Sequence, residues 1–244
     1  MSHESLVVVG DRFAEFLGNR GTIPVSALLW RLRGHDGTPL AVTVGQGLTA
    51  AQLAELSELA ARTGGQVSLH GHAGFVDKRL THKRDPRNVL IGEPQQVDDR
   101  TFTAPLVVDE NTETLDDHLT GQHIPAIALT EAARQTWTAV TEKFLVDGTD
   151  RTRFVINDFA SSFHSYVFPL PTALVYRLLE VRNSPVGRTF RCRVEFVQSD
   201  AVAAVVSAEY RVIPERFSEK QEAMAARAAV KRHLVEQPVL AGTA

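Results

Sequence analysis

The sequence predicts an α+β protein in which one long central helix is wrapped by a curved antiparallel sheet, and a small α/β unit precedes this arrangement. Three observations lead to this prediction. Residues 125–145 would be apolar on more than one side of a helix, which is typical of a helix enclosed by its domain. Three or four segments of alternating apolar and polar residues follow it. Before it, strand, helix and strand succeed one another at the spacing of a parallel βαβ pair.

Length, charge and apolar runs limit the class of protein. The 244 residues suffice for a small and a medium domain, and we place the α/β unit at 1–78, the main domain at 79–214 and a C-terminal helix and tail at 215–244. A net charge of −3 without a basic stripe argues against a dedicated nucleic-acid-binding protein. The run at 6–9 is too short for a signal peptide and no run suggests a membrane span, so we expect a cytoplasmic protein.

The first unit contains three apolar strands and two helices with recognisable ends. Asp11 can cap a helix that ends at Gly18, and Thr49 can cap one that runs to Arg62. Residues 23–32 fit either a helix or a strand. The expected strands are Leu6–Val9, Leu40–Val44 and Val67–Leu69.

Two features of this unit have a chemical and a plain interpretation. The turn Gly45-Gln46-Gly47 precedes a helix and could cradle a phosphate, but it lacks the further residues of known phosphate-binding motifs, so we favour a strand-to-helix turn. His70 and His72 could ligate a metal, yet no third ligand is adjacent, and solvated loop histidines are favoured.

The main domain begins after a basic, turn-rich junction at 71–87. Its helix should begin near Pro125, because proline suits the first helical turn, and should end near Leu145. The only cysteine, Cys192, excludes an intrachain disulfide and occupies a core-facing strand position. The expected strands are Val89–Ile91, Thr101–Val108, Arg153–Phe168, Ala173–Arg182, Thr189–Gln198 and Val202–Val212, and a charged helix follows from Glu215 to about Glu236.

Residues 117–135, DHLTGQHIPAIALTEAARQ, carry the strongest chemical signal. His118 and His123 carry imidazole groups, which can accept or donate a proton. The amides of Ala126 and Ile127, at the positive end of the helix, can polarise a carbonyl group. Glu131 lies about two turns into the apolar helix, where a charge is costly unless it is paired or protonated.

Plainer interpretations of the same residues remain open. Glu131 could pair with Arg134 or Gln135 while the histidines only cap the loop. A metal site would need His118, His123 and Asp116 or Asp117 together with a third oriented ligand, so we expect no metal and no other cofactor. His164 interrupts an aromatic strand and is expected to be a structural histidine.

The order of strand, polar loop, enclosed helix and strands resembles the hotdog fold. Over about residues 80–213 the chain also resembles the A-factor biosynthesis hotdog family of actinobacteria. The resemblance rests on two motifs: His82-Lys83 with Val89-Leu90, and Asp117-His118, His123-Ile124-Pro125, Leu129 and Glu131–Gln135. More distantly, the second motif is similar to that of the 3-hydroxyacyl carrier-protein dehydratases, which implies His118, or alternatively His123, and Glu131 as the catalytic pair.

These resemblances imply a bacterial secondary-metabolism enzyme that acts on an acyl or β-ketoacyl intermediate bound to coenzyme A or a carrier protein. The reaction would be acyl transfer and condensation, or His- and Glu-assisted dehydration or cyclisation. Substrate contacts would come from Ala126, Ile127, Arg134, Gln135 and His82. The other possibilities are a hotdog protein that binds a ligand without catalysis and a structural partner subunit.

Two departures from the family pattern matter. Family members usually carry two hotdog repeats, whereas this chain has one, which would leave a sheet edge uncovered. We therefore expect a homodimer whose sites combine a histidine of one subunit with a glutamate of the other. In addition, Ala126 stands where the family has glycine, so the approach of a substrate to this amide is more restricted.

Overall fold

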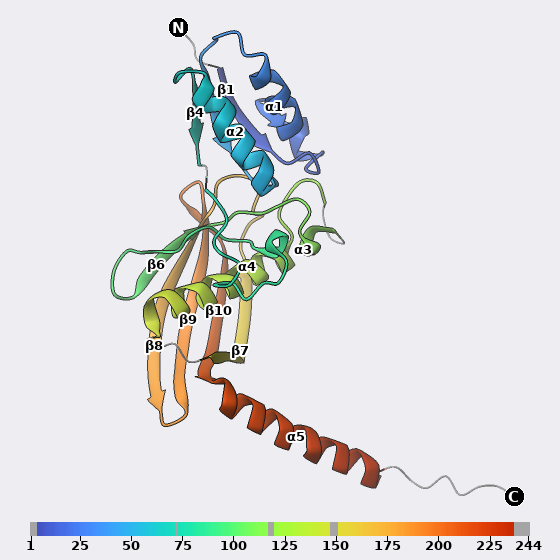
Figure 1. Ribbon diagram of the computed structural model, residues 1–244, viewed down its shortest axis with the longest axis vertical. Coiled ribbons are helices and arrows are strands. Elements are labelled where there is room, and N and C mark those ends of the chain that lie inside the picture. The colour runs from blue at the N-terminus through green and yellow to red at the C-terminus, as the bar shows by residue number, and fades with distance from the viewer. Residues whose placement is uncertain (1–3, 72, 117–119, 147–150, 237–244) are drawn as a thin grey trace, which may run out of the picture.

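The computed structural model describes residues 4–71, 73–116, 120–146 and 151–236 (Figure 1). The molecule is elongated. The N-terminal α/β unit occupies one end, a larger antiparallel sheet with its helix occupies the middle, and a C-terminal helix projects from the other end (Figure 1). No helix among the described residues is both long enough and apolar enough to cross a membrane.

The N-terminal unit is a four-stranded parallel sheet in the order β2-β1-β3-β4, with two helices. The predicted cap of the second helix is confirmed: Thr49 and Gln52 form a reciprocal capping box, which satisfies two amides at the helix start. The elements are β1 (Glu4–Val9), β2 (Thr22–Pro24), α1 (Val25–Arg33), β3 (Leu40–Val44), α2 (Ala50–Arg62) and β4 (Val67–His70).

Two local details of this unit differ from the prediction or resolve it. The helix expected after Asp11 is wrong, because only a 3-10 turn, η1 (Phe16–Gly18), forms there, where the Phe16 amide donates to the distant Gly121 carbonyl. The ambiguous stretch at 23–32 contains both structures, since β2 ends at Pro24 and α1 begins at the next residue.

The second sheet has six antiparallel strands in the order β5-β6-β8-β9-β10-β7. β8, β9 and β10 form the expected meander, whereas β7 pairs with the last strand and becomes one edge of the sheet. The strands are β5 (Gln95–Gln96), β6 (Thr101–Pro105), β7 (Thr152–Phe163), β8 (Ala173–Ser184), β9 (Gly187–Gln198) and β10 (Ala201–Pro214).

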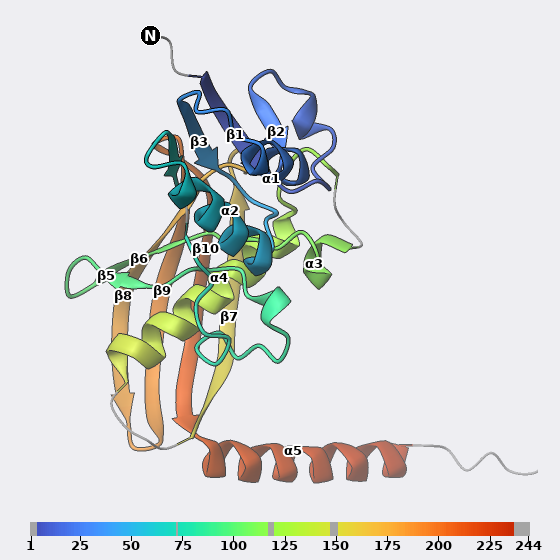
Figure 2. The same cartoon turned by 45° about the horizontal axis from the view of Figure 1, so that its top comes forward.

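Helix α4 (Ala126–Val140) lies across one face of this sheet (Figure 2). A single π-helical turn, η3 (Thr141–Leu145), extends it, so the predicted helix over 125–145 is continuous but changes its hydrogen-bond spacing. The helix buries more than one side, as expected: Ala128, Leu129, Ala132, Ala133 and Trp137 are each at most 2% exposed. Cys192 is also buried, which confirms its predicted core position.

Three predicted strands are shorter than expected or absent. The strand expected at 101–108 ends at Pro105, the last residue of β6. Residues 89–91 are buried but do not form a strand, because the Leu90 amide donates to the side chain of Gln135 rather than to a neighbouring strand, and only Ile91 makes a bridge. The strand expected at 153–168 ends at Phe163, after which the amides of His164 and Ser165 both donate to the Ala203 carbonyl.

The turn Gly45-Gln46-Gly47 joins the two parts of the chain. Its amides donate to Val8, Pro169 and Val108 carbonyls, at 2.8, 3.1 and 2.8 Å. A Cβ atom on Gly45 would lie 2.2 Å from the Pro169 carbonyl oxygen, so glycine is required there. With all three amides used, the turn has none left for a phosphate, and the plain interpretation holds.

Candidate active site

The N-terminus of α4 is built by a short polar loop and by the segment that follows β7. Pro125 caps the helix with extended backbone. The Ile124 amide donates to the Val167 carbonyl at 2.8 Å, which fixes the loop against that segment. The first amides with an acceptor within the helix are those of Ala128 and Leu129, both bonded to the Pro125 carbonyl. The amides of Ala126 and Ile127 therefore point out of the open end of the helix.

His123 stands next to this open end. Its Nδ1 atom lies 3.1 Å from the Thr120 hydroxyl, and its ring contacts the Tyr166 ring at a centroid distance of 4.7 Å. These two contacts orient the imidazole and leave Nε2 without a bonding partner among the described residues. Ile127 and Tyr166 are 50% and 67% exposed, so an apolar surface flanks the histidine. His118, the other predicted base, lies outside the residues that the structure describes.

Glu131 occupies a cluster of cations rather than an isolated apolar site. Its Oε1 atom accepts from Lys83 Nζ at 2.7 Å, from Arg134 Nη2 at 2.8 Å and from Gln135 Nε2 at 3.0 Å. Its Oε2 atom accepts from Arg134 Nε at 2.8 Å. Glu131 thus pairs with both Arg134 and Gln135, which the helical spacing allowed as alternatives. Lys83 is a further partner that the spacing did not indicate.

The protonation state of Glu131 follows from these contacts. Burial by itself would raise the pKa of this carboxyl group, but the hydrogen bonds and charge of Arg134, together with Lys83 and Gln135, outweigh it and hold the pKa below its ordinary value. Glu131 is therefore ionised at neutral pH. A carboxylate in this state can hold or orient a positive or proton-bearing group, but it cannot serve as a proton donor.

Arg134 and Gln135 also fasten residues 81–90 onto α4. Arg134 Nη2 donates to the Thr81 carbonyl at 2.8 Å. Gln135, which is fully buried, accepts from the Leu90 amide and donates to the Asn88 carbonyl, both at 2.8 Å. These residues were predicted to bind substrate, but their polar atoms form hydrogen bonds with the protein's own backbone.

His82 lies on the same segment and has an unusual backbone. Its φ angle of 55° is in the left-handed region, which costs a non-glycine residue energy and is enriched at functional sites. Its Nε2 atom lies 2.7 Å from Glu142 Oε1, and its ring meets the edge of Phe154 at 5.4 Å. No local pattern in the sequence indicates the contact of His82 with Glu142, because the two residues are 60 positions apart.

The remaining chemical candidates have modest surroundings. His70 Nε2 lies 3.2 Å from the Ser68 hydroxyl, and its suggested partner His72 is outside the described part of the chain. Within the ranges that the structure describes, no group of three His, Cys, Asp or Glu residues could hold a metal ion. Burial raises the pKa of Cys192 to about 12, so its thiol is unreactive at neutral pH.

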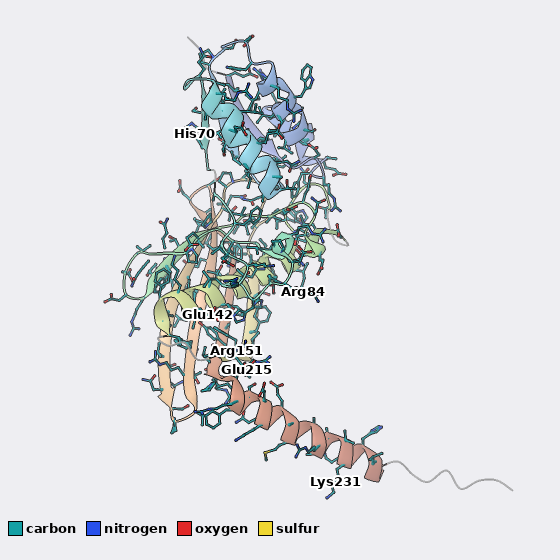
Figure 3. All side chains as sticks on the ribbon, in the orientation of Figure 1. His70, Arg84, Glu142, Arg151, Glu215 and Lys231 are labelled. Atoms are coloured by element: carbon teal, nitrogen blue, oxygen red, sulfur yellow. The ribbon has the colours of Figure 1, made fainter. Side chains whose placement is uncertain are left out.

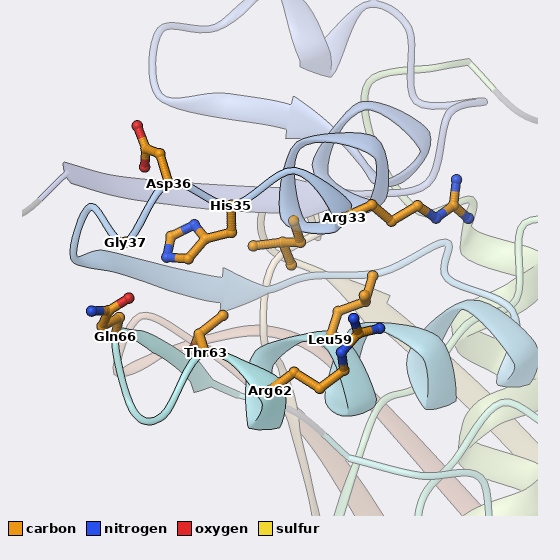
Figure 4. Close-up of a pocket in the computed structure, with 9 residues that line it drawn as sticks. Arg33, His35, Asp36, Gly37, Leu59, Arg62, Thr63 and Gln66 are labelled. Atoms are coloured by element: carbon orange, nitrogen blue, oxygen red, sulfur yellow. The ribbon is translucent and has the colours of Figure 1, made fainter.

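A cavity of about 420 Å³ lies in the N-terminal unit, between the ends of α1 and α2 (Figure 4). His35, Arg62, Thr63 and Gln66 line it, and the buried Nε2 atom of His35 has no hydrogen-bond partner. The cavity is built from other elements than the N-terminus of α4, and none of the predicted site residues lines it.

Comparison with protein families matches residues 65–214, more than half of the chain, to the family described as A-factor biosynthesis hotdog domain. Solved structures that are similar include a mutant thioesterase from Pseudomonas aeruginosa, with 16% identity, TM-score 0.41, and coverage of 56% of this chain and 93% of that one. A thioesterase from Haemophilus influenzae gives 12% identity, TM-score 0.40, and coverage of 57% and 92%. Among curated proteins nothing matches.

Proposed function

Because the chain belongs to the A-factor biosynthesis hotdog domain family, we propose that it is a bacterial secondary-metabolism enzyme acting on an acyl or β-ketoacyl thioester. The thioester would be carried by coenzyme A or by a carrier protein. The reaction would be transfer of the acyl group to an acceptor, or dehydration or cyclisation of the keto intermediate. The observation that carries the proposal is the oriented imidazole of His123 beside the open N-terminus of α4.

In this mechanism the helix end and the imidazole have separate tasks. The amides of Ala126 and Ile127 would hold the thioester carbonyl oxygen, where the helix dipole stabilises developing negative charge. The free Nε2 atom of His123 would move the proton at the reacting carbon or oxygen. His118 stays the other candidate for this proton transfer.

Glu131 has an orienting task in the proposal. Its lowered pKa supports an ionised carboxylate that holds Lys83, and with it the segment at 81–90, against α4. A carboxylate of this kind could also orient the histidine of a second subunit. The acid role is disfavoured, because a proton donor at neutral pH needs a raised pKa.

We further propose a homodimer that forms along β7. This strand is an edge of the sheet, so no strand among the described residues pairs with its outer side. Phe159 and Phe163 pair in register with the buried Ala208 and Ala204, which places both rings on the core-facing side of the sheet, yet they are 41% and 46% exposed. A two-fold partner would cover these rings together with Ile127.

Consumption of a β-ketoacyl thioester, followed by mass spectrometry, tests the mechanism. Acyl transfer also releases a free thiol, whereas dehydration leaves the thioester bond intact and lowers the mass by one water. The protein's own thiol adds little background, because Cys192 is buried. We expect His123→Ala or His118→Ala, and Glu131→Gln, to lower the rate by about 10²-fold or more, and His164→Ala, the matched control, to leave it near normal. Near-normal rates in all three site variants would remove the mechanism. Mass spectrometry with and without a glycerol-type phosphate acceptor separates transfer from dehydration and cyclisation.

A second candidate function is ligand binding without catalysis. The observation that favours it is that Lys83 and Arg134 neutralise the Glu131 carboxylate, and among the described residues no histidine is paired with it. This candidate predicts that an acyl or lactone ligand raises the melting temperature while its concentration stays constant over hours. Consumption of the ligand would exclude it.

A further inference from the structure

Helix α5 (Glu215–Glu236) is the one long element that leaves the body of the molecule (Figures 1 and 3). Its 22 residues extend for roughly 30 Å at the usual rise per residue. Every described side chain from Glu219 to Leu234 is exposed. In proteins most of the stability of a helix comes from packing one of its faces against other elements, so α5 gains from a partner surface.

The root of α5 is firmly attached at the β7 edge of the sheet. The Glu215 amide donates to the Arg151 carbonyl at 2.9 Å, and the Glu215 carboxylate binds Arg153 Nη2 at 2.9 Å. Ser218, in the first turn, is buried. These contacts fix the direction of the helix. In Figures 1 and 2 it runs outward beyond β7, away from β8 and β9.

The outer half of α5 carries an apolar stripe. Ala223, Ala226, Val230 and Leu234 follow one another at spacings of three and four residues and therefore form one narrow stripe. Val230 and Leu234 are 59% and 69% exposed. Arg227 and Lys231 flank the stripe, as they would at the rim of an interface.

The position of a second copy follows from strand direction. α5 leaves the end of the sheet that lies opposite the N-terminal α/β unit (Figure 1). If two copies pair along β7 about a two-fold axis, the strands run antiparallel, and the partner is inverted end to end. The projecting helix of one copy then reaches the end of the other copy that carries the α/β unit.

We propose that α5 is an arm through which each copy holds the α/β unit of a second copy, using the stripe of Ala223, Ala226, Val230 and Leu234. The inference rests on the proposed pairing along β7 and adds a second contact to it. The α/β unit would then serve in assembly rather than in phosphate binding, for which the turn at Gly45–Gly47 has no free amide.

Sedimentation of the full chain over a range of concentrations tests the arm. We expect Val230→Glu combined with Leu234→Glu to raise the dimer dissociation constant about tenfold or more, since two buried apolar side chains are lost. Met224→Glu is the matched control, because Met224 is also 69% exposed but lies on another face of the helix. Equal dissociation constants for the double variant and the wild type would overturn the inference.

A second experiment maps the contact. The buried Cys192 allows a single introduced thiol, Leu234→Cys, to carry a photoreactive cross-linker, and mixing with isotope-labelled chain identifies links between copies. We expect links to residues 4–71 of the other copy. Links only between two α5 helices, or only to other proteins, would overturn the inference.

The test of the α5 contact can be distinguished from the tests of the proposed dimer and of the proposed enzymatic activity. Phe163→Glu should weaken the dimer whether or not the arm exists, with unchanged circular dichroism as the check on folding. A chain that is monomeric at all concentrations would remove both the dimer and the arm. A dimer weakened by Phe163→Glu but not by the α5 variants would leave the dimer and remove the arm, and turnover assays decide the enzyme independently.

Discussion

Replacing Glu131 by glutamine tests the cluster that joins α4 to the segment at 81–90. The carboxylate accepts four hydrogen bonds, from Lys83, from two nitrogens of Arg134 and from Gln135. A glutamine side chain has one oxygen. The NH2 group of the glutamine therefore replaces either the oxygen that accepts from Arg134 Nε or the oxygen that accepts from Lys83, Arg134 Nη2 and Gln135. In either orientation two hydrogen-bond donors face each other. Both cations also lose their counter-charge.

The cost can be worked out from burial. Breaking a fully buried ion pair by removing one partner costs about 3–5 kcal/mol. Here the side chains of Glu131, Lys83 and Arg134 keep 19%, 26% and 25% of their exposure, so water screens part of the effect. We expect a loss of about 2–3 kcal/mol in the free energy of unfolding. For a chain of this length that corresponds to a fall of about 5–10 °C in melting temperature.

The loss should depend on pH. The pKa of Glu131 is lowered in the folded protein, so its ionised form contributes stability above the unfolded value of about 4.3. That contribution is lost as the pH falls through the lower folded pKa. The difference between the wild type and Glu131→Gln should therefore narrow below about pH 4. Burial raises the pKa of Glu110, so this group changes the stability with pH in the opposite direction. Because Glu110 is present in both proteins, it does not alter the difference between them.

Calorimetry at pH 7 and at lower pH measures both effects. Glu180→Gln is the control, because Glu180 is 43% exposed in its pairs with Arg182 and Arg191 and should change stability by less than about 0.5 kcal/mol. A melting temperature of Glu131→Gln within about 1 °C of the wild type at pH 7 would refute the reasoning from burial. A large loss of turnover with that unchanged melting temperature would assign Glu131 to catalysis alone.

Three further predictions concern other buried groups. Gln46→Ala removes the side chain that bonds the Leu106 carbonyl and the Val108 amide at the junction, while the Leu170 carbonyl keeps the Thr172 hydroxyl, and should cost about 2–4 kcal/mol, measured by urea unfolding. Tyr210→Phe removes the hydroxyl that bonds Thr141 at 2.6 Å and Tyr176 at 3.2 Å and should cost about 1–3 kcal/mol; an unchanged midpoint of unfolding would contradict it. Cys192 should resist thiol reagents at pH 8 in the native protein and react only in denaturant, so rapid native labelling would contradict its burial.

Elements with local signals were predictable from the sequence. Thr49 caps α2 with a residue three positions later, and Pro125 sets the start of α4. The alternation of β9 places Cys192 in the core. Each of these depends on neighbours within about one turn or a few strand positions, which the sequence lists directly.

Elements whose partners are distant in sequence were not predictable. Residues 89–91 are apolar and were expected to form a strand, but Gln135, 45 positions later, takes the Leu90 amide. β7 was expected to reach Phe168, but it leaves the sheet at Phe163, where the backbone of β10 supplies the next acceptor. In both places a tertiary contact decided which hydrogen bonds form.

The surroundings of Glu131 show the same division. The helical pattern alone predicts that the carboxylate lies on an enclosed helix and that Arg134 and Gln135, three and four positions later, can reach it, because helical spacing fixes those distances. The contact with Lys83, which comes from a separate segment, arises only when the chain folds. Helical periodicity carries no information on which side chain the chain brings back from 48 positions away, and that cation is one of those that hold Glu131 ionised.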